Sequence, residues 1–187
     1  RSVPVAGTGN VGGLIGSNHS GVLLESAALA PVAGLDNGVS QQGAVGGLVG
    51  LNMGMIRDSL ATGAAAADNH HSLGGVAGSN VGQGMVQRAY FAAAMPAQDT
   101  AEVGGVVGDA MDSAMILDSF WDTEESGKTT SDGGTGRTTA QMRSAATFTT
   151  AGWDLTRVWD IREGLTYPFL RGLIIQLTPP VVITQPP

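Results

Sequence analysis

The sequence predicts an all-β fold, a parallel β-solenoid similar to a right-handed β-helix, and two observations support this prediction. First, the pattern Gly-Gly-Φ-Φ-Gly, where Φ is apolar, occurs four times, beginning at Gly12, Gly46, Gly74 and Gly104. Second, the copies follow one another at intervals of 34, 28 and 30 residues. Self-similarity with a period of about 20 to 50 residues is typical of stacked repeats rather than of one packed core.

The composition agrees with many thin strands. The 187 residues include 29 Gly and 42% hydrophobic residues, but only 5% aromatic residues. The formal net charge of −7 argues against nucleic acid and anionic membrane surfaces as partners, because both require clustered Lys and Arg. The chain has no Cys and no run of about eighteen apolar residues, so we expect neither disulfides nor membrane insertion.

Each copy continues into a second apolar segment. A small residue precedes two apolar residues, two mostly polar residues and another small residue, in segments 21–26, 54–59, 84–89 and 114–119. We therefore expect two short strands per repeat, joined by a turn in which Asn and Gly supply positive φ angles. After a lead-in at 1–10, the four repeats occupy residues 11–122, divided as 11–44, 45–72, 73–102 and 103–122.

Stacking of equivalent strands at about 4.8 Å would align these positions in files. Neighbouring residues face opposite sides, so we expect two apolar files that are both covered: Leu14, Leu48, Val76 and Val106, and Ile15, Val49, Ala77 and Val107. The paired glycines are expected to allow a close backbone approach or a sharp corner. They are Gly12, Gly13, Gly46, Gly47, Gly74, Gly75, Gly104 and Gly105.

Three asparagines, Asn18, Asn52 and Asn80, recur at one position of the turn. In stacked coils they could form an amide ladder, as in cross-β assemblies, or a row that contacts a sugar. We favour a structural role, because Asn in turns commonly closes local hydrogen bonds. The fourth copy departs from the pattern, with Asp109 where Asn is expected.

The composition changes after the fourth repeat. Residues 123–172 are expected to form a capping segment that begins with a Gly-, Ser- and Thr-rich loop. A short helix is predicted near 139–146, with Thr138 or Thr139 at its N-cap. Four aromatic residues follow closely and are expected to cover the open end of the solenoid: Trp153, Trp159, Tyr167 and Phe169. Residues 173–187 are predicted to be a Pro-rich linker to a following module.

The clearest repeat, Val45 to Ser59 followed by Leu60-Ala-Thr-Gly63, resembles the GLUG repeat of large bacterial surface proteins. These include filamentous-haemagglutinin-type adhesins and regions beside the catalytic part of immunoglobulin A peptidases. The segments 119–127 and 163–170 are similar to the sequence that closes such arrays, so the resemblance covers roughly residues 10 to 172. It implies a secreted or cell-surface bacterial protein with a solenoid fold.

Few residues suggest chemistry. His19, His70 and His71 lack the spacing of a zinc site, so neither a metal nor another cofactor is predicted. Catalysis by a polysaccharide-active solenoid would need paired carboxylates beside a basic residue such as Lys128, the sole lysine. No such pairing is evident, and the chain is predicted not to be an enzyme.

The predicted function is that of a non-catalytic structural or adhesive segment, serving as a rigid stalk or as a carbohydrate- or matrix-binding module in attachment or biofilm. Its expected partners are a polysaccharide or cell-surface glycan and neighbouring modules of the same long chain. If exposed, Trp121, Trp153 and Trp159 are candidates to contact a sugar ring, although core packing is the favoured role. The alternative is a self-associating extracellular filament subunit.

Overall fold

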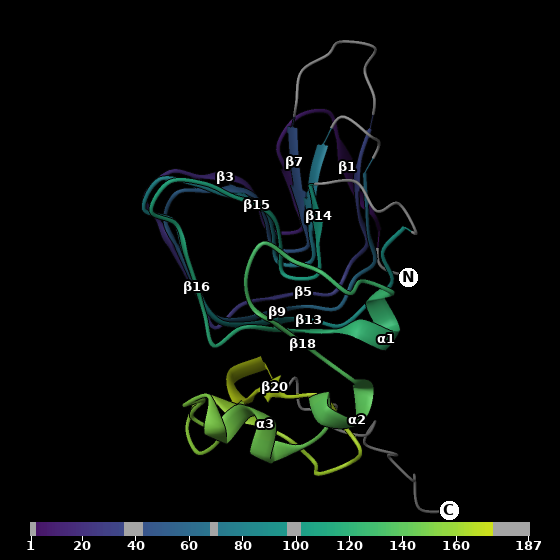
Figure 1. Cartoon of the computed structure of the whole chain (residues 1–187), viewed down its shortest axis with the longest axis vertical. Helices are drawn as coiled ribbons and strands as arrows, with labels where there is room; N and C mark the ends of the chain where they lie inside the picture. The colour runs from purple at the N-terminus through teal and green to yellow at the C-terminus, as the bar shows by residue number, and fades with distance from the viewer. Residues whose placement is uncertain (1–2, 36–42, 68–70, 97–101, 174–187) are drawn as a thin grey trace, which may run out of the picture.

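The computed structural model of the chain describes residues 3–35, 43–67, 71–96 and 102–173. It is a parallel β-solenoid of about three turns, so the predicted fold class is confirmed (Figure 1). The four repeats form four stacked layers, each of which is called a coil. Within the described residues, no helix has the length and apolar character needed to cross a membrane.

Each coil has three main sides. The first sheet contains β2 (Val11–Gly12), β7 (Gly43–Gly46), β11 (His71–Gly74) and β14 (Val103–Gly104). The second sheet contains β3 (Ile15–Asn18), β8 (Val49–Asn52), β12 (Ala77–Asn80) and β15 (Val107–Ala110). The third sheet contains β4 (Val22–Leu24), β5 (Ala27–Ala28), β9 (Met55–Ala61), β13 (Met85–Phe91), β16 (Met115–Leu117), β17 (Phe120–Asp122) and β18 (Thr135–Arg137). A small sheet joins β1 (Val5–Gly7), β6 (Val32–Gly34) and β10 (Ala65–Ala66).

The predicted division of each repeat into two strands is wrong, because the Gly-Gly-Φ-Φ-Gly segment is itself bent. In the second repeat, β7 ends at Gly46 and β8 begins at Val49. A Cβ on Gly46 would lie 2.7 Å from the backbone nitrogen of Gly78 and 2.8 Å from the Cα of Ala77, which belong to the next coil. The expected sharp corner is therefore confirmed, and it divides the segment between the first and second sheets.

Both predicted apolar files are buried. Leu48, Val76 and Val106 lie inside the corner with no exposed surface, and so do Val49, Ala77 and Val107 in the second sheet. The exceptions belong to the first coil of the stack, where Leu14 is 45% exposed and Ile15 is partly buried. The solenoid interior is thus filled mostly by small and medium apolar side chains, together with the rings of Phe91 and Trp121.

The positive φ angles lie only partly where expected: Gly82 in the turn of the third repeat has φ 63°, and Asp112 in the turn of the fourth has φ 62°. None of the repeated asparagines has one, whereas Glu25, Asp58, Arg88 and Asp118 have φ between 46° and 50°. These four residues occupy equivalent places in the third sheet, directly before the small residue that closes each segment. The residue with positive φ makes a bend that interrupts the backbone hydrogen bonds between strands. A Ser side chain that follows the bend replaces one of these bonds: the hydroxyl of Ser59 accepts a hydrogen bond from the backbone nitrogen of Ser26 at 3.1 Å.

The asparagines form an amide ladder, as the first of the two possibilities for this row predicted. Asn18 Nδ2 donates to Asn52 Oδ1 at 2.9 Å, and Asn52 Nδ2 donates to Asn80 Oδ1 at 2.8 Å. The expectation about Asp109 is wrong, because Asp109 is in register with Ser79 and it is Ala110 that pairs with Asn80. The ladder therefore ends at the third coil.

The predicted loop after the fourth repeat is partly wrong. Its first residues form α1 (Thr123–Ser126), and its last form β18, which pairs in parallel with β17. Between them, Thr130 O accepts a hydrogen bond from Gly105 N, and Ser131 Oγ accepts one from Val106 N, each at 3.0 Å. Residues 128–137 thus satisfy the edge of the fourth coil as an incomplete fifth layer.

The predicted helix near 139–146 is found as two short helices, α2 (Thr139–Met142) and α3 (Ala145–Thr150). Thr138 is the N-cap of α2, with a capping box formed with Gln141. A hairpin of β19 (Trp159–Asp160) and β20 (Phe169–Leu170) and a 3₁₀ turn at Arg171–Leu173 follow. The predicted linker beyond residue 173 lies outside the described residues.

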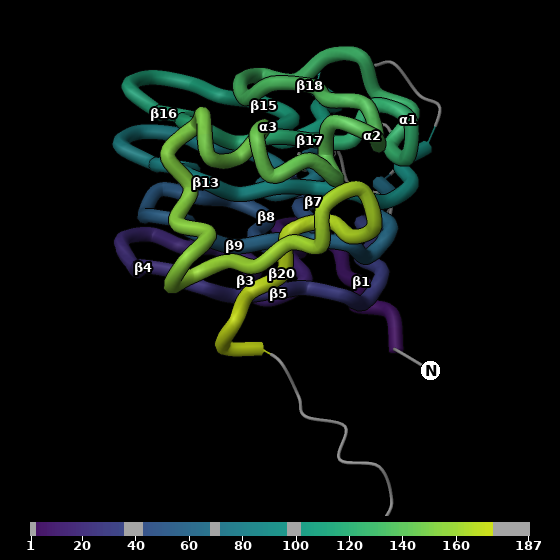
Figure 2. The backbone as a smooth tube through the Cα atoms, turned by 90° about the horizontal axis from the view of Figure 1, so that it is seen from below, coloured from purple at the N-terminus to yellow at the C-terminus, as the bar shows by residue number. Residues whose placement is uncertain are grey.

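The aromatic segment, residues 138–173, differs in position from the predicted end cover. It lies along the outer side of the third sheet and crosses the stack from the last coil toward the first (Figures 1 and 2). The end of the stack is instead covered by residues 128–137. The aromatic residues of this segment therefore join coils laterally.

We predict that Gly75→Ala lowers the free energy of unfolding by about 3 kcal/mol or more, because overpacking a core typically costs 1–3 kcal/mol and here a backbone is also involved. The new Cβ would meet the carbonyl oxygen of Gly105 and the Cβ of Phe91, the latter at 2.6 Å. Gly172→Ala, with no atom within 4 Å of its added Cβ, should change stability by less than about 0.5 kcal/mol. Urea unfolding measures the stability of both variants. An equal effect of the two changes would contradict the conclusion that the corner leaves no room for a Cβ at Gly75.

Candidate functional site

The third sheet separates two files of side chains that alternate along each strand. The inward file consists of Ala28, Ala61, Phe91 and Trp121, which are in register across the coils. The outward file consists of Ala27, Leu60, Tyr90 and Phe120, also in register. The outward file packs against buried residues of the aromatic segment: Met142, Phe148, Trp153, Trp159 and Leu170.

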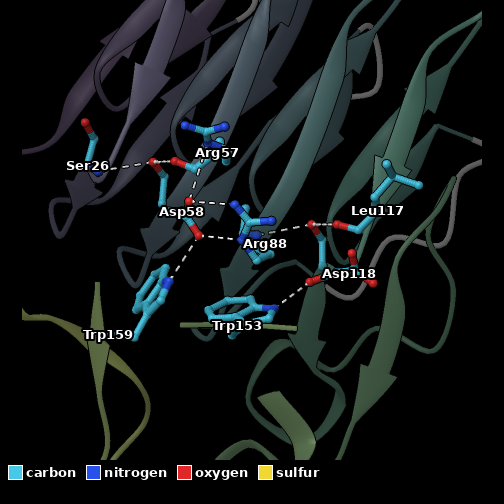
Figure 3. Close-up of polar contacts among 11 residues, drawn as sticks. Ser26, Arg57, Asp58, Arg88, Leu117, Asp118, Trp153 and Trp159 are labelled. Atoms are coloured by element: carbon cyan, nitrogen blue, oxygen red, sulfur yellow. Dashed lines mark hydrogen bonds and ion pairs between the residues drawn. The ribbon is translucent and has the colours of Figure 1, made fainter. Parts of the chain in front are cut away.

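A polar cluster lies at the edge of this aromatic packing (Figure 3). Arg88 makes a bidentate pair with Asp58, with Nε to Oδ1 at 2.7 Å and Nη2 to Oδ2 at 2.9 Å. Trp159 Nε1 also donates to Asp58 Oδ1 at 3.3 Å, and Trp153 Nε1 donates to the backbone oxygen of Asp118 at 2.8 Å. The cluster thus fixes the Trp159 indole to the bend of the second coil and the Trp153 indole to the bend of the fourth.

The tyrosines of this region are also committed to packing. Tyr90 is buried and its hydroxyl donates to Pro168 O at 2.7 Å, while Tyr167 donates to Asp122 Oδ2 at 2.7 Å. Burial raises the pKa of Tyr167 to about 12, and its hydrogen bond to Asp122 contributes. Both phenols therefore stay protonated at neutral pH and act as hydrogen-bond donors between the aromatic segment and the solenoid.

The three candidate tryptophans are all buried. Trp121 is 5% exposed inside the solenoid, where its Nε1 donates to Lys128 O at 2.8 Å. Trp153 and Trp159 are 3% and 0% exposed in the aromatic cluster. Their burial favours core packing over contact with a sugar ring. Lys128 is 2% exposed and likewise lies away from solvent.

A concave polar surface lies where the first and second sheets meet at the outside of the corner. In Figure 1 these sheets diverge like two arms, β7 and β14 on one side and β3 and β15 on the other. A groove of about 390 Å³ lies between them. It is lined by Asn10, Gly43, Ala44, Leu51, Ser72, Ser79, Glu102, Asp109 and Met111.

The groove is built from two files that face one another across the corner. On the first sheet, Ser72 is in register with Ala44. Glu102 continues this file and lies one residue before the start of β14. Leu51, Ser79 and Asp109 are in register on the second sheet. Because each coil contributes one residue from each sheet, the groove runs along the stack and across the strands.

Carboxylates concentrate at the end of the groove nearest the fourth coil. Glu102 Oε2 accepts a hydrogen bond from Ser72 Oγ at 3.0 Å, and Asp132 Oδ2 accepts one from Ala110 N at 3.0 Å. Burial raises the pKa of the Asp109 carboxyl above its ordinary value, and the charges of Glu102 and Asp132 raise it further. The field at this end of the groove is therefore negative.

Neither polar pocket contains the combination expected of a polysaccharide-active site. The described lining of the groove holds two carboxylates, Glu102 and Asp109, and no Lys or Arg. A second hollow of about 480 Å³, between the third sheet and α3, holds Arg137 and the single carboxylate of Asp118. Among the described residues, no group of three or more His, Asp or Glu side chains is placed to hold a metal ion. The absence of catalysis stays a prediction.

The positions of the repeated glycines and asparagines could be predicted from the sequence, whereas the groove was not predicted. The glycines and asparagines are where the repeat pattern put them, in the corner and the ladder. The groove residues precede or follow those positions and differ in type from coil to coil, as Ala44, Ser72 and Glu102 do. The signal that could have found them is the corner itself, since two sheets that diverge from it must leave a concave outer angle.

We predict that Arg88→Met lowers the free energy of unfolding by about 2–4 kcal/mol, toward the lower part of the range for breaking a buried pair, because the Arg88 side chain is 22% exposed. The loss arises because the Asp58 carboxylate, with 7% side-chain exposure, loses its main hydrogen-bond and ion-pair partner. Arg162→Met at an exposed position is the matched control and should be nearly neutral. Thermal unfolding of both variants measures the difference, and equal melting temperatures would refute the structural role of the pair.

We also predict that Asp109→Asn raises the melting temperature at pH 7. The folded state holds the Asp109 proton more tightly than the unfolded state, so ionisation costs stability once the pH exceeds the folded pKa. The difference from wild type should vanish as the pH falls below the ordinary value of 3.8.

Asp154→Asn is the control of opposite sign. Hydrogen bonds from Thr156 lower the pKa of Asp154, so its charge stabilises the fold above pH 3.8, and its removal should lower the melting temperature. Melting curves between pH 3 and pH 8 test both variants, and a stabilising Asp109→Asn effect that persisted unchanged at the lowest pH would contradict the electrostatic cause.

Comparison with known proteins adds one relative. A protein of Evansella cellulosilytica described as a Gly-rich membrane protein is 31% identical over 130 residues, which is 69% of this chain. The alignment spans 12% of that relative's length. No family model and no solved structure matches the chain. The chain is thus a β-solenoid segment with distant homology to a small part of a much longer Gly-rich protein.

Proposed function

We propose that this chain is a non-catalytic structural and adhesive segment of a secreted or cell-surface bacterial protein, in which the solenoid serves as a rigid stalk. The observation that carries this proposal is the lateral aromatic packing. Leu60, Tyr90 and Phe120 come from three successive coils and pack against one continuous segment. Separating the coils along the stack would therefore break this packing as well as the strand ladders.

Other observations support the same proposal. The amide ladder of Asn18, Asn52 and Asn80 adds side-chain hydrogen bonds along the stack axis, parallel to those of the backbone. The repeat resembles the GLUG repeat of bacterial surface proteins, and the homologous relative is many times longer than this chain. A short rigid segment within a long surface protein suits attachment or biofilm, where binding loops are held away from the cell.

The groove favours a second role within this function, that of a carbohydrate- or matrix-binding module. Its lining of hydroxyl, amide and carboxylate groups can replace the hydrogen bonds that a sugar makes with water. It is placed on rigid strands that the third sheet and the aromatic segment stabilise. A stalk that carries such a groove would bind along its side.

A self-associating filament subunit is the alternative. Within the described residues, β2, β3 and β4 are terminal strands of their sheets, and Val22 of the first coil is 64% exposed. An uncovered strand edge can recruit another chain. Sedimentation measured against protein concentration separates the two, because a stalk segment stays monomeric whereas a filament subunit grows in mass.

We predict that the wild-type chain, pulled between residues 3 and 173, resists as one cooperative unit and ruptures in a single main step. Trp153→Ala should release the aromatic segment in a separate step at lower force, because it removes the ring that contacts Phe120, Phe148 and Trp159. Leu165→Ala, at a position 75% exposed, is the control and should leave the trace unchanged.

Single-molecule force spectroscopy makes this measurement. Coil-by-coil unfolding of the wild type at low force would refute the stalk, because the coils would then bear load independently.

A further inference from the structure

We propose that the groove between the first and second sheets binds a protonated amino sugar, as one unit of an amine-bearing polysaccharide. This inference rests on the adhesive function proposed above and names the ligand class for it. Its basis is a concave site with a negative end, a hydroxyl that is open to the groove, and small side chains that leave room for a ring.

The site is a cavity and not only a group of charges. Its volume of about 390 Å³ falls within the range of small-molecule sites. Gly43, Ala44 and Ser72 provide one wall with little side-chain volume. Leu51 and Met111 add apolar surface, which suits the C–H groups of a sugar ring.

Ser79 is an independent sign of a ligand. It is 7% exposed and lines the groove from β12. Its hydroxyl makes no hydrogen bond with any other described residue, in contrast to Ser72, which donates to Glu102. Because the Ser79 Oγ is not a fully buried atom, it is open to the groove, where a sugar hydroxyl can take the place of solvent as its hydrogen-bond partner.

The charges select an amine. Glu102 and Asp109 line the groove, Asp132 lies close enough to affect Asp109, and the described lining has no Lys or Arg to neutralise them. A protonated amine would relieve the repulsion among these carboxylates and donate charge-assisted hydrogen bonds. A divalent metal suits the groove less well, because the described carboxylates are not grouped in a way that could hold one.

An amino sugar suits the groove better than a basic peptide. Hydroxyl and amide groups line both walls. Asn10, which is bonded to Ser17 and Ala44, and Ser72, which is bonded to Glu102, lie on one side, and Ser79 lies on the other. These match a ligand that presents hydroxyls around its ring. A long Lys or Arg side chain would satisfy the carboxylates but would not present ring hydroxyls to the Ser79 hydroxyl on the opposite wall.

Titration calorimetry with a glucosamine hexamer, compared with the N-acetylglucosamine hexamer of the same length, tests this inference. We expect the amine-bearing hexamer to bind at least tenfold more tightly. Glu102→Gln with Asp109→Asn should weaken its binding at least tenfold, and Ser79→Ala should weaken binding severalfold. The control, Asp112→Asn with Glu125→Gln, removes two charges outside the groove and should bind as the wild type does. Melting curves show that each variant is folded.

Three results would overturn the inference. Equal binding of the two hexamers would exclude selection of the amine, while the adhesive function would stand because a glycan still binds. Undiminished binding by the Glu102→Gln, Asp109→Asn variant would place the ligand elsewhere. Equally tight binding of a lysine hexamer that Ser79→Ala leaves unchanged would show a general cation surface. The stalk function is tested separately by pulling, so its failure is distinguishable from these outcomes.

Discussion

The close approach of two backbones at the Gly-Gly corner is the constraint on which the rest of this solenoid depends. The first glycine of each pair faces the backbone of the next sheet, and the second faces a residue of the inward file. In the third coil, a Cβ on Gly75 would overlap Phe91 and the carbonyl oxygen of Gly105. Because glycine has no Cβ to clash with these neighbours, the chain can turn sharply there, and the three sheets can enclose a thin interior. The repeat is therefore defined by missing side chains as much as by apolar ones.

The same thin interior accounts for the position of the aromatic segment. The inward file offers room for Ala in the first two coils and for the rings of Phe91 and Trp121 in the last two. Period-two alternation then turns Leu60, Tyr90 and Phe120 outward on one flank of the stack. An apolar flank of this kind has to be covered, and the aromatic segment covers it. The bends at Asp58 and Asp118 lie on this flank and provide partners for the indole nitrogens of Trp159 and Trp153.

Much of the fold could be predicted from the sequence because the same pattern of residues occurs in successive repeats. The period, the glycine pairs, the apolar files and the asparagine position each occur several times, so register follows from alignment. The bend at Arg88 could not be predicted, since Arg has no preference for positive φ and only the stacking of equivalent residues imposes it. The flank position of Trp159 also depends on a contact with Asp58, 101 residues away in the sequence, that no local pattern encodes. The groove was missed because its residues vary between coils.

That variation has a physical meaning for the groove. The paired-glycine positions of the corner leave no room for a Cβ, so the coils are nearly identical there, whereas positions on the outer angle line the groove and hold side chains of different type. At the first-sheet position the groove changes from Ala44 through Ser72 to Glu102, and at the second-sheet position it changes from Leu51 through Ser79 to Asp109. Polarity and negative charge thus increase from the second coil to the fourth in both walls at once. An invariant corner fixes the shape of the groove, and the variable positions beside it set a graded charge, which gives an otherwise uniform stack one chemically distinct end.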